Sequence, residues 1–133
     1  MNQHLTLVYE SGCPFCSPGI HSELIIESEL VFAIYDKYPV TPGHALIIPR
    51  RHEKDYFGLS AEEQESCWRL LQWVKDIVQQ KYKPDGYNIG INNLYAAGQT
   101  VSHVHIHLIP RYLGDVERPQ GGVRGVIPSK KEY

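Results

Sequence analysis

The chain has 133 residues, of which 42% are hydrophobic, and its formal net charge is −2 at pH 7. That length fits one compact domain, and the balanced charge excludes a global basic field that would bind nucleic acid. No apolar run approaches the ~18 residues of a membrane span, and no signal peptide is recognised. Three cysteines, two of them in a CxxC motif, do not make a secreted disulfide framework, so we predict a cytoplasmic protein.

Apolar runs bounded by turn residues predict short strands in the first half of the chain. The expected strands are residues 4–9, Leu24–Glu27, Leu30–Tyr35 and His44–Pro49. A Ser28-Glu29 turn separates the second run from the third, and Pro42-Gly43 leads into the fourth. The short spacing between these runs favours hairpin-like connections.

One long helix is expected next. Ser60 and Glu63 form a capping box, and apolar residues at helical spacing continue to about Tyr82, where Lys83-Pro84-Asp85-Gly86 ends the pattern. The apolar face comprises Cys67, Leu70, Leu71, Val74, Ile77 and Val78, so Cys67 is expected in the core. Two further strands, Tyr87–Asn92 and Val101–Ile109, follow. Strands before and after one helix favour an α+β domain with a mostly antiparallel sheet.

The segment 103–107 reads His-Val-His-Ile-His, which alternates with period two. As a strand it places three imidazoles on one face, ~7 Å apart, and apolar residues on the other face. A fold has little structural reason for three titratable rings in a row. The open alternatives are a solvated face, a metal site that uses two of the rings, and acid–base or nucleophilic chemistry on an anionic substrate.

Three segments together resemble the histidine triad (HIT) family of nucleotide hydrolases and transferases. Residues 98–111, Gly-Gln-Thr-Val-Ser-His-Val-His-Ile-His-Leu-Ile-Pro-Arg, are similar to the family signature. Residues 35–49 are similar to its upstream strand–turn–strand, and Cys13-Pro-Phe-Cys16 matches a zinc-binding opening found in many bacterial members. In order and spacing, these segments cover nearly the whole chain.

The resemblance implies an α+β, HIT-like fold. Its sheet is antiparallel and five-stranded, with one long helix and a short helix, and dimerisation extends the sheet. We expect a single HIT domain over residues 1–133, with a zinc-binding N-terminal segment (1–20) and an irregular C-terminal tail (114–133). The tail either wraps the surface or brings Arg118 or Arg124 to a substrate phosphate, including one on the neighbouring subunit. Trp68 and Trp73 leave the main apolar stripe of the helix and also favour a homodimer.

The family mechanism, carried onto this sequence, makes His105 the nucleophile. It attacks an α-phosphorus in line, forms a nucleotidyl-histidine intermediate, and water hydrolyses that intermediate. His107 matches the third triad position, where it serves the non-bridging oxygens or the leaving group. His44 matches an upstream histidine that reaches the same site.

The resemblance also implies how a nucleotide is held. Asp36 matches the ribose-binding acid, although an Asp at a strand end is more often a turn former. Asn92 and Gln99 match amide positions that contact phosphate or leaving group, and the loop 97–100, including Thr100, can direct backbone N–H groups at phosphate oxygens. The base is expected among apolar residues such as Phe32 and Ile34.

Cys13 and Cys16 are expected to bind a structural zinc ion together with His52 and His103, which match the family's zinc-binding variant. A closed Cys₂His₂ shell holds the N-terminal segment against the sheet and leaves no open position for catalysis. A thioredoxin-like redox pair requires a helix that starts at the first cysteine, and Ser17-Pro18-Gly19 speaks against it. An idle pair of cysteines is the remaining alternative.

The predicted function is therefore hydrolysis at the α-phosphate of dinucleoside polyphosphates or related nucleoside phosphate conjugates, with release of AMP. Adenine-type substrates are favoured, and neither nucleic acid nor membrane is an expected partner. The alternatives are an adenosine phosphoramidase, a nucleotidyltransferase, a nucleotide-binding protein without turnover, and a metal-dependent hydrolase with zinc on His103 and His105. Transfer is disfavoured because the related uridylyltransferase branch carries glutamine where His107 stands.

Overall fold

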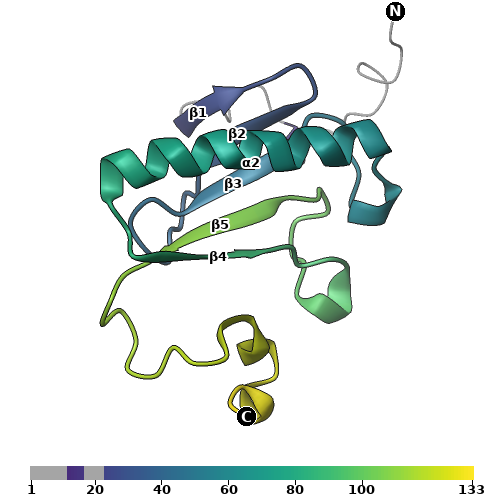
Figure 1. Ribbon diagram of the computed structural model, residues 1–133. Coiled ribbons are helices and arrows are strands. Elements are labelled where there is room, and N and C mark those ends of the chain that lie inside the picture. Colours follow the sequence, from purple (N-terminus) through teal and green to yellow (C-terminus); the bar gives the residue numbers. More distant parts are fainter. Residues whose placement is uncertain (1–11, 17–22) are drawn as a thin grey trace, which may run out of the picture.

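The computed structural model describes residues 12–16 and 23–133 and contains a five-stranded antiparallel sheet with one long helix on one face (Figure 1). The strands are β1 (Leu24–Glu27), β2 (Val31–Tyr35), β3 (Ala45–Pro49), β4 (Gly86–Gly90) and β5 (Ile106–Arg111). Their order in the sheet is β1-β2-β3-β5-β4, and all neighbours are antiparallel. The expected α+β class is confirmed, whereas the strand predicted at 4–9 lies outside the described residues.

The long helix α2 runs from Ala61 to Tyr82 and begins with the predicted capping box. The Ser60 hydroxyl accepts from the Glu63 N–H at 3.0 Å, and the Glu63 carboxylate accepts from the Ser60 N–H at 2.8 Å. Lys83 ends the helix in the left-handed conformation, with φ of 52°. Arg51 donates to both Glu63 oxygens, at 2.8 and 3.0 Å, and so ties the end of β3 to the start of α2.

The main core lies between α2 and the sheet face that it covers. Alternate strand residues point to that face, as the pleat requires. The buried cluster comprises Val31, Ala33, Ala45, Ile47, Cys67, Leu70, Leu71, Val74, Val78, Ile106 and Leu108. The predicted apolar stripe of the helix is therefore correct, except that Ile77 is only half-buried.

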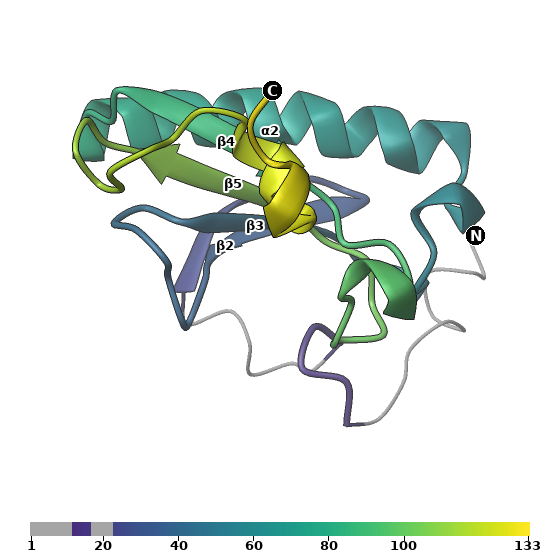
Figure 2. The ribbon, with the colours of Figure 1, turned by 90° about the horizontal axis from the view of Figure 1, so that it is seen from below.

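The opposite face of the sheet carries a smaller apolar cluster. It consists of Phe32, Ile34, Leu46 and Ile48, and Phe15 packs against it. Figure 2 shows that segment 12–16 and α2 lie on opposite sides of the sheet. The side chains expected to bind substrate and metal gather on this second face.

The strand predicted at Val101–Ile109 is wrong in its first half, because β5 begins only at Ile106. The Val104 N–H donates to the Glu53 carbonyl at 2.7 Å, so the chain is bound to the segment after β3 rather than to a neighbouring strand. His103 then turns toward Cys13 and Cys16 instead of lining one face with the other two histidines. The three imidazoles expected on one face are therefore divided: His103 lies with the cysteines, and His105 and His107 stay together.

The remaining described elements are 3-10 turns, at Tyr56–Gly58 (η2), Tyr95–Ala97 (η3), Gly122–Val126 (η4) and Pro128–Lys130 (η5). The C-terminal tail contains the last two and runs along the outer side of β4 (Figure 1). Among the described residues, no helix is both long enough and apolar enough to span a membrane.

Candidate functional site

His105 and His107 lie at the start of β5, on the sheet face that α2 leaves uncovered. His107 is opposite Leu46 of β3 and Gly90 of β4 in the strand register. The centroids of the two imidazole rings are 5.0 Å apart. Two histidines of the predicted triad therefore share one site beside the second apolar cluster.

One ring nitrogen of His105 is committed to the backbone. Its Nδ1 lies 2.9 Å from the carbonyl oxygen of His103, and because a carbonyl can only accept, Nδ1 carries the proton and donates. The Nε2 lone pair is then available to attack an electrophile. Burial lowers the pKa of His105, which favours the neutral, nucleophilic ring. The Phe15 ring lies edge-on to it, with centroids 5.0 Å apart.

His44 and Asp36 reach the same site because β2 and β3 pair there. The Asp36 N–H donates to the His44 carbonyl at 2.9 Å, just beyond the paired residues Tyr35 and Ala45. His44 Nε2 lies 3.0 Å from His107 Nδ1 and 3.4 Å from Asp36 Oδ2. The structure thus brings four predicted site residues together from three strand ends.

The turn into β3 requires glycine at position 43. Gly43 has φ of 89°, and a Cβ there would lie 2.9 Å from Cδ2 of Tyr82. This turn directly precedes His44, so the Pro42-Gly43 pair of the sequence fixes where that imidazole enters the site.

Both members of the His44–His107 pair are held neutral. Burial, followed by the neighbouring His105 and His44, lowers the pKa of His107 to about 4. Burial likewise lowers the pKa of His44, against a weaker opposing effect of Asp36.

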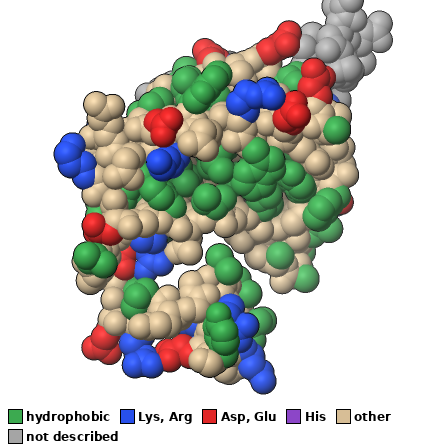
Figure 3. All heavy atoms as spheres, in the orientation of Figure 1, with side chains coloured by type: hydrophobic (Ala, Val, Ile, Leu, Met, Phe, Trp, Pro, Cys, Tyr) green, Lys and Arg blue, Asp and Glu red, His purple; other side chains and the backbone are tan. Residues whose placement is uncertain are grey.

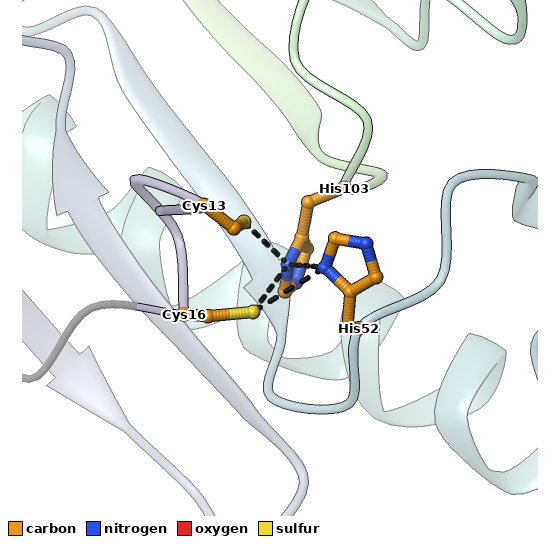
Figure 4. Close-up of side chains that lie close together, drawn as sticks. All are labelled: Cys13, Cys16, His52 and His103. Atoms are coloured by element: carbon orange, nitrogen blue, oxygen red, sulfur yellow. Dashed lines mark hydrogen bonds between the residues drawn. The ribbon is translucent and has the colours of Figure 1, made fainter. Parts of the chain in front are cut away.

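The second cluster joins Cys13, Cys16, His52 and His103, the four predicted metal ligands (Figure 4). The Cys16 sulfur lies 3.3 Å from His52 Nδ1 and 3.4 Å from His103 Nδ1, and the Cys13 sulfur lies 3.4 Å from His103 Nδ1. The two Nδ1 atoms are 3.2 Å apart. A tetrahedral zinc ion with Zn–S bonds of ~2.3 Å and Zn–N bonds of ~2.0 Å requires S···N edges of ~3.5 Å and an N···N edge of ~3.3 Å. The four residues therefore fit one tetrahedral metal ion.

The protonation of His103 suits a metal ligand. Its Nε2 donates to the Pro49 carbonyl at 2.7 Å, which leaves Nδ1 unprotonated toward the two sulfurs. His103 is fully buried, and burial lowers its pKa to about 4 and raises the pKa of the Cys13 thiol. Because both His103 nitrogens are used in this way, a catalytic metal shared between His103 and His105 has no support in the geometry.

The predicted phosphate-binding amides are placed less favourably. Gln99 Oε1 accepts from the Leu94 N–H at 2.6 Å, and its Nε2 donates to the carbonyls of Lys54 and Val101. Asn92 is exposed, and Thr100 lines a cavity of about 310 Å³ beside the Cys13–His52 side of the metal cluster. Their contacts with a substrate stay predictions.

Sequence reasoning missed two contacts, one between the loop after β4 and the start of η2, and one at His44. Asn93, which follows the predicted Asn92, accepts from the Tyr56 N–H at 2.7 Å and donates to Asp55 at 3.0 Å. The Val40 N–H donates to His44 Nδ1 at 3.1 Å. Adjacent asparagines differ in the sequence only by position, and a backbone N–H has no sequence signal.

The arginines of the tail are used within the tail. Arg118 is paired with Glu132, and Arg124 donates to the carbonyls of Lys130 and Lys131 and stacks on Tyr133, 4.3 Å from the ring centroid. Neither guanidinium group is directed at the histidines in this arrangement.

Comparison with known proteins agrees with these observations. Residues 17–114 match the family model described as HIT domain. A bis(5'-adenosyl)-triphosphatase of Dictyostelium discoideum is 40% identical over 96 residues, which are 72% of this chain and 64% of that protein, so the chain spans less than two thirds of this relative.

Solved structures extend the likeness to three dimensions. A protein from Streptococcus mutans UA159 superposes with a TM-score of 0.75 at 31% identity, over 85% of this chain and 74% of that one. A structure described as a Zn-bound histidine triad family protein from Mycobacterium smegmatis gives a TM-score of 0.65 at 36% identity, over 69% and 67%. The chain belongs to the HIT domain family.

Proposed function

We propose that the protein hydrolyses dinucleoside polyphosphates at the α-phosphate and releases a nucleoside monophosphate, with adenine as the favoured base. The observation that carries the proposal is the locked tautomer of His105, whose Nδ1–H is held by the His103 carbonyl and whose Nε2 is free. The likeness to a bis(5'-adenosyl)-triphosphatase supports this substrate class over other nucleoside phosphate conjugates.

In the proposed reaction, His105 Nε2 attacks the α-phosphorus, a P–N bond forms, and the P–O bond to the leaving nucleotide breaks. His107, next to it, donates to a non-bridging oxygen or to the leaving oxygen. Water then attacks the phosphorus in line, from the side that the leaving nucleotide vacated and opposite the P–N bond. The water loses a proton, the P–N bond breaks, and AMP leaves. His105 returns to its neutral state for the next cycle.

The nucleoside is proposed to lie along the second apolar cluster. Phe32 and Ile34 belong to that cluster and lie on β2, and Asp36 directly follows that strand. The Asp36 carboxylate is half-buried and can accept from ribose hydroxyls. Asn92, Gln99 and Thr100 are the proposed phosphate contacts, and for Gln99 this requires release of its bonds to Leu94 and Lys54.

We also propose that the Cys₂His₂ cluster binds one structural zinc ion. When bound, zinc in a closed shell contributes folding free energy rather than an open coordination position. The ligands come from segment 12–16, from the segment after β3 and from the segment before β5, so they tie three separate parts of the chain together.

The deciding experiment is a parallel turnover assay on diadenosine polyphosphates and on adenosine phosphoramidates. We expect kcat/KM to be at least about tenfold higher for the polyphosphates, with AMP as one product. Higher kcat/KM on the phosphoramidates would favour the phosphoramidase alternative. Absence of turnover on both, in protein that binds AMP, would favour a nucleotide-binding protein.

A homodimer is proposed on exposed apolar surface. Trp68 and Trp73 of α2 and Ile89 of the edge strand β4 are 42%, 48% and 43% exposed, and Figure 3 shows hydrophobic side chains gathered over this side of the molecule. β4 is an edge strand of the described sheet, and an edge strand beside apolar surface is a site at which a second copy can pair. We expect sedimentation at about 30 kDa, twice the 15.2 kDa of one chain; a species of one chain's mass at micromolar concentration would contradict it.

A further inference from the structure

The His44–His107 pair is coupled to the backbone of the loop that precedes β3. We propose that the Val40 N–H sets the tautomers of both rings and so makes His107 a neutral donor through its Nε2–H. The proposal rests on the proposed function in that it assigns His107 its donor atom. Val40 acts through His44 and is a positioning residue.

The Val40 N–H is a group of fixed polarity in this chain of contacts. A backbone N–H always donates, so His44 Nδ1, 3.1 Å from the Val40 nitrogen, must accept and carries no proton. The proton of neutral His44 is therefore on Nε2. That N–H faces His107 Nδ1 at 3.0 Å, with Asp36 Oδ2 at 3.4 Å as a second acceptor.

The consequence passes to His107. Because its Nδ1 accepts from His44, its own proton must be on Nε2. A second proton on His107 would sit on Nδ1 and face the Nε2–H of His44. A second proton on His44 would sit on Nδ1 and face the Val40 N–H. Among the described residues, the charged group and the ring that act on the pair are Asp36 and His105, and the depressed pKa values of His44 and His107 agree with a pair that stays neutral.

The donor is held firmly in place. The Thr41 hydroxyl donates to the Pro110 carbonyl at 2.6 Å, and the Tyr112 hydroxyl donates to the Pro42 carbonyl at 2.7 Å, so the two residues after Val40 are tied to the end of β5 and the residue that follows it. Asp36 Oδ1 accepts from the Tyr38 N–H at 2.9 Å. The Val40 side chain itself is 66% exposed, which assigns the role to its backbone.

The test compares Val40→Pro, which removes the N–H, with Val40→Ala, which keeps it. Nitrogen-15 NMR of histidine-labelled, zinc-loaded protein at pH 7 reports each ring's tautomer without any turnover. In wild type and Val40→Ala we expect His44 and His107 in the Nε2–H form. In Val40→Pro we expect both rings to become mixtures of tautomers and to take up a proton nearer pH 6.5.

Kinetics give the second measurement. Relative to Val40→Ala, Val40→Pro should lower kcat by about tenfold or more and change KM by less than about threefold, since the effect falls on a donor used in the chemical step. If Val40→Pro instead raised KM about tenfold or more and left kcat unchanged, the loop would have a merely structural role, and the proposal would be overturned.

The wild-type spectrum decides the proposal even if Val40→Pro does not fold. An Nδ1–H tautomer or an imidazolium at His44 at pH 7 would overturn it, whatever the protein hydrolyses. If the spectrum shows the expected tautomers but the protein turns over no nucleotide, the inference about the His44–His107 pair stands and the proposed function is refuted.

Discussion

Two histidine clusters lie at the two ends of the segment 103–107, and they differ in where the ring nitrogens point. In the metal cluster, the Nδ1 atoms of His52 and His103 converge with two sulfurs on one point. At the other end, His44 and His107 are joined nitrogen to nitrogen, and His105 keeps Nε2 free. The first arrangement fits a tetrahedral cation. In the second, the ring nitrogens of His44 and His107 are joined by a hydrogen bond, beside Asp36.

The difference shows that the partner of the other ring nitrogen decides what a histidine can do. His103 gives Nε2–H to the Pro49 carbonyl and has Nδ1 left for a metal. His105 gives Nδ1–H to the His103 carbonyl and has Nε2 left for attack. Residues two apart in one motif thus receive opposite tautomers from two backbone carbonyls.

The largest expected effect tests His105 as the nucleophile. His105→Asn should lower turnover by about three orders of magnitude or more, because the covalent route is lost. Nucleotide affinity should stay within about tenfold, since ~1.4 kcal/mol covers one modest contact. Steady-state kinetics and calorimetric binding measure the two quantities.

Mass spectrometry of rapidly quenched wild-type protein supplies the control. A nucleotidyl adduct is expected on the peptide that contains residues 103–107, and none on that of the variant. Near wild-type turnover by His105→Ala would end the nucleophile assignment.

The next effect separates the metal cluster from the catalytic one. Wild type should carry about one zinc ion per chain, and Cys13→Ser should lose most of it. The same substitution should lower the free energy of unfolding by a few kcal/mol. Cys67→Ala is the matched control, because this cysteine is buried in the main core, with a pKa raised by burial to about 12. It should keep the zinc and lose about 1 kcal/mol through a small cavity. Elemental analysis and urea unfolding give both values; equal stability of wild type and Cys13→Ser would contradict a structural metal.

A smaller effect addresses His107. His107→Ala should slow cleavage of substrates with poor leaving groups more than those with good ones, because a donor matters most where the leaving oxygen is basic. The measurement is kcat for a series of adenosine phosphate esters. Equal slowing across the series would assign His107 to the non-bridging oxygens instead.

The smallest expected effect is on the stability of the folded protein at acidic pH. The pKa of His107 is lowered to about 4 in the folded protein from an ordinary value of 6.5, so between these values the unfolded chain binds more protons. Stability therefore falls as pH falls from about 6.5 to about 4. Between pH 7 and pH 5, wild type should lose more unfolding free energy than His107→Asn by on the order of 1 kcal/mol. Urea titrations at the two pH values test this, and parallel losses in the two proteins would speak against it.

The sequence predicted the fold well where a pattern is local. The capping box and the apolar stripe placed α2, and alternating apolar runs placed four strands between residues 24 and 90 within two residues of their observed ends. Period-two alternation failed at 101–105 because the backbone there pairs with Glu53 instead of with a strand. Alternation of side chains with period two predicts which of them share a face only where the residues form a strand of a sheet.

By itself, the sequence determined the family, the α+β class and the residue types of both clusters. HxHxH and CxxC are chemically distinctive, and the apolar periods fix the elements on which they lie. Only the tertiary structure decided which nitrogen of each ring is free and which loop holds it. That choice depends on the carbonyls of Pro49 and His103 and on the N–H of Val40. Every residue carries a backbone carbonyl, and every residue except proline carries a backbone N–H, so the role of these groups is visible only once the strands have brought them to the imidazoles.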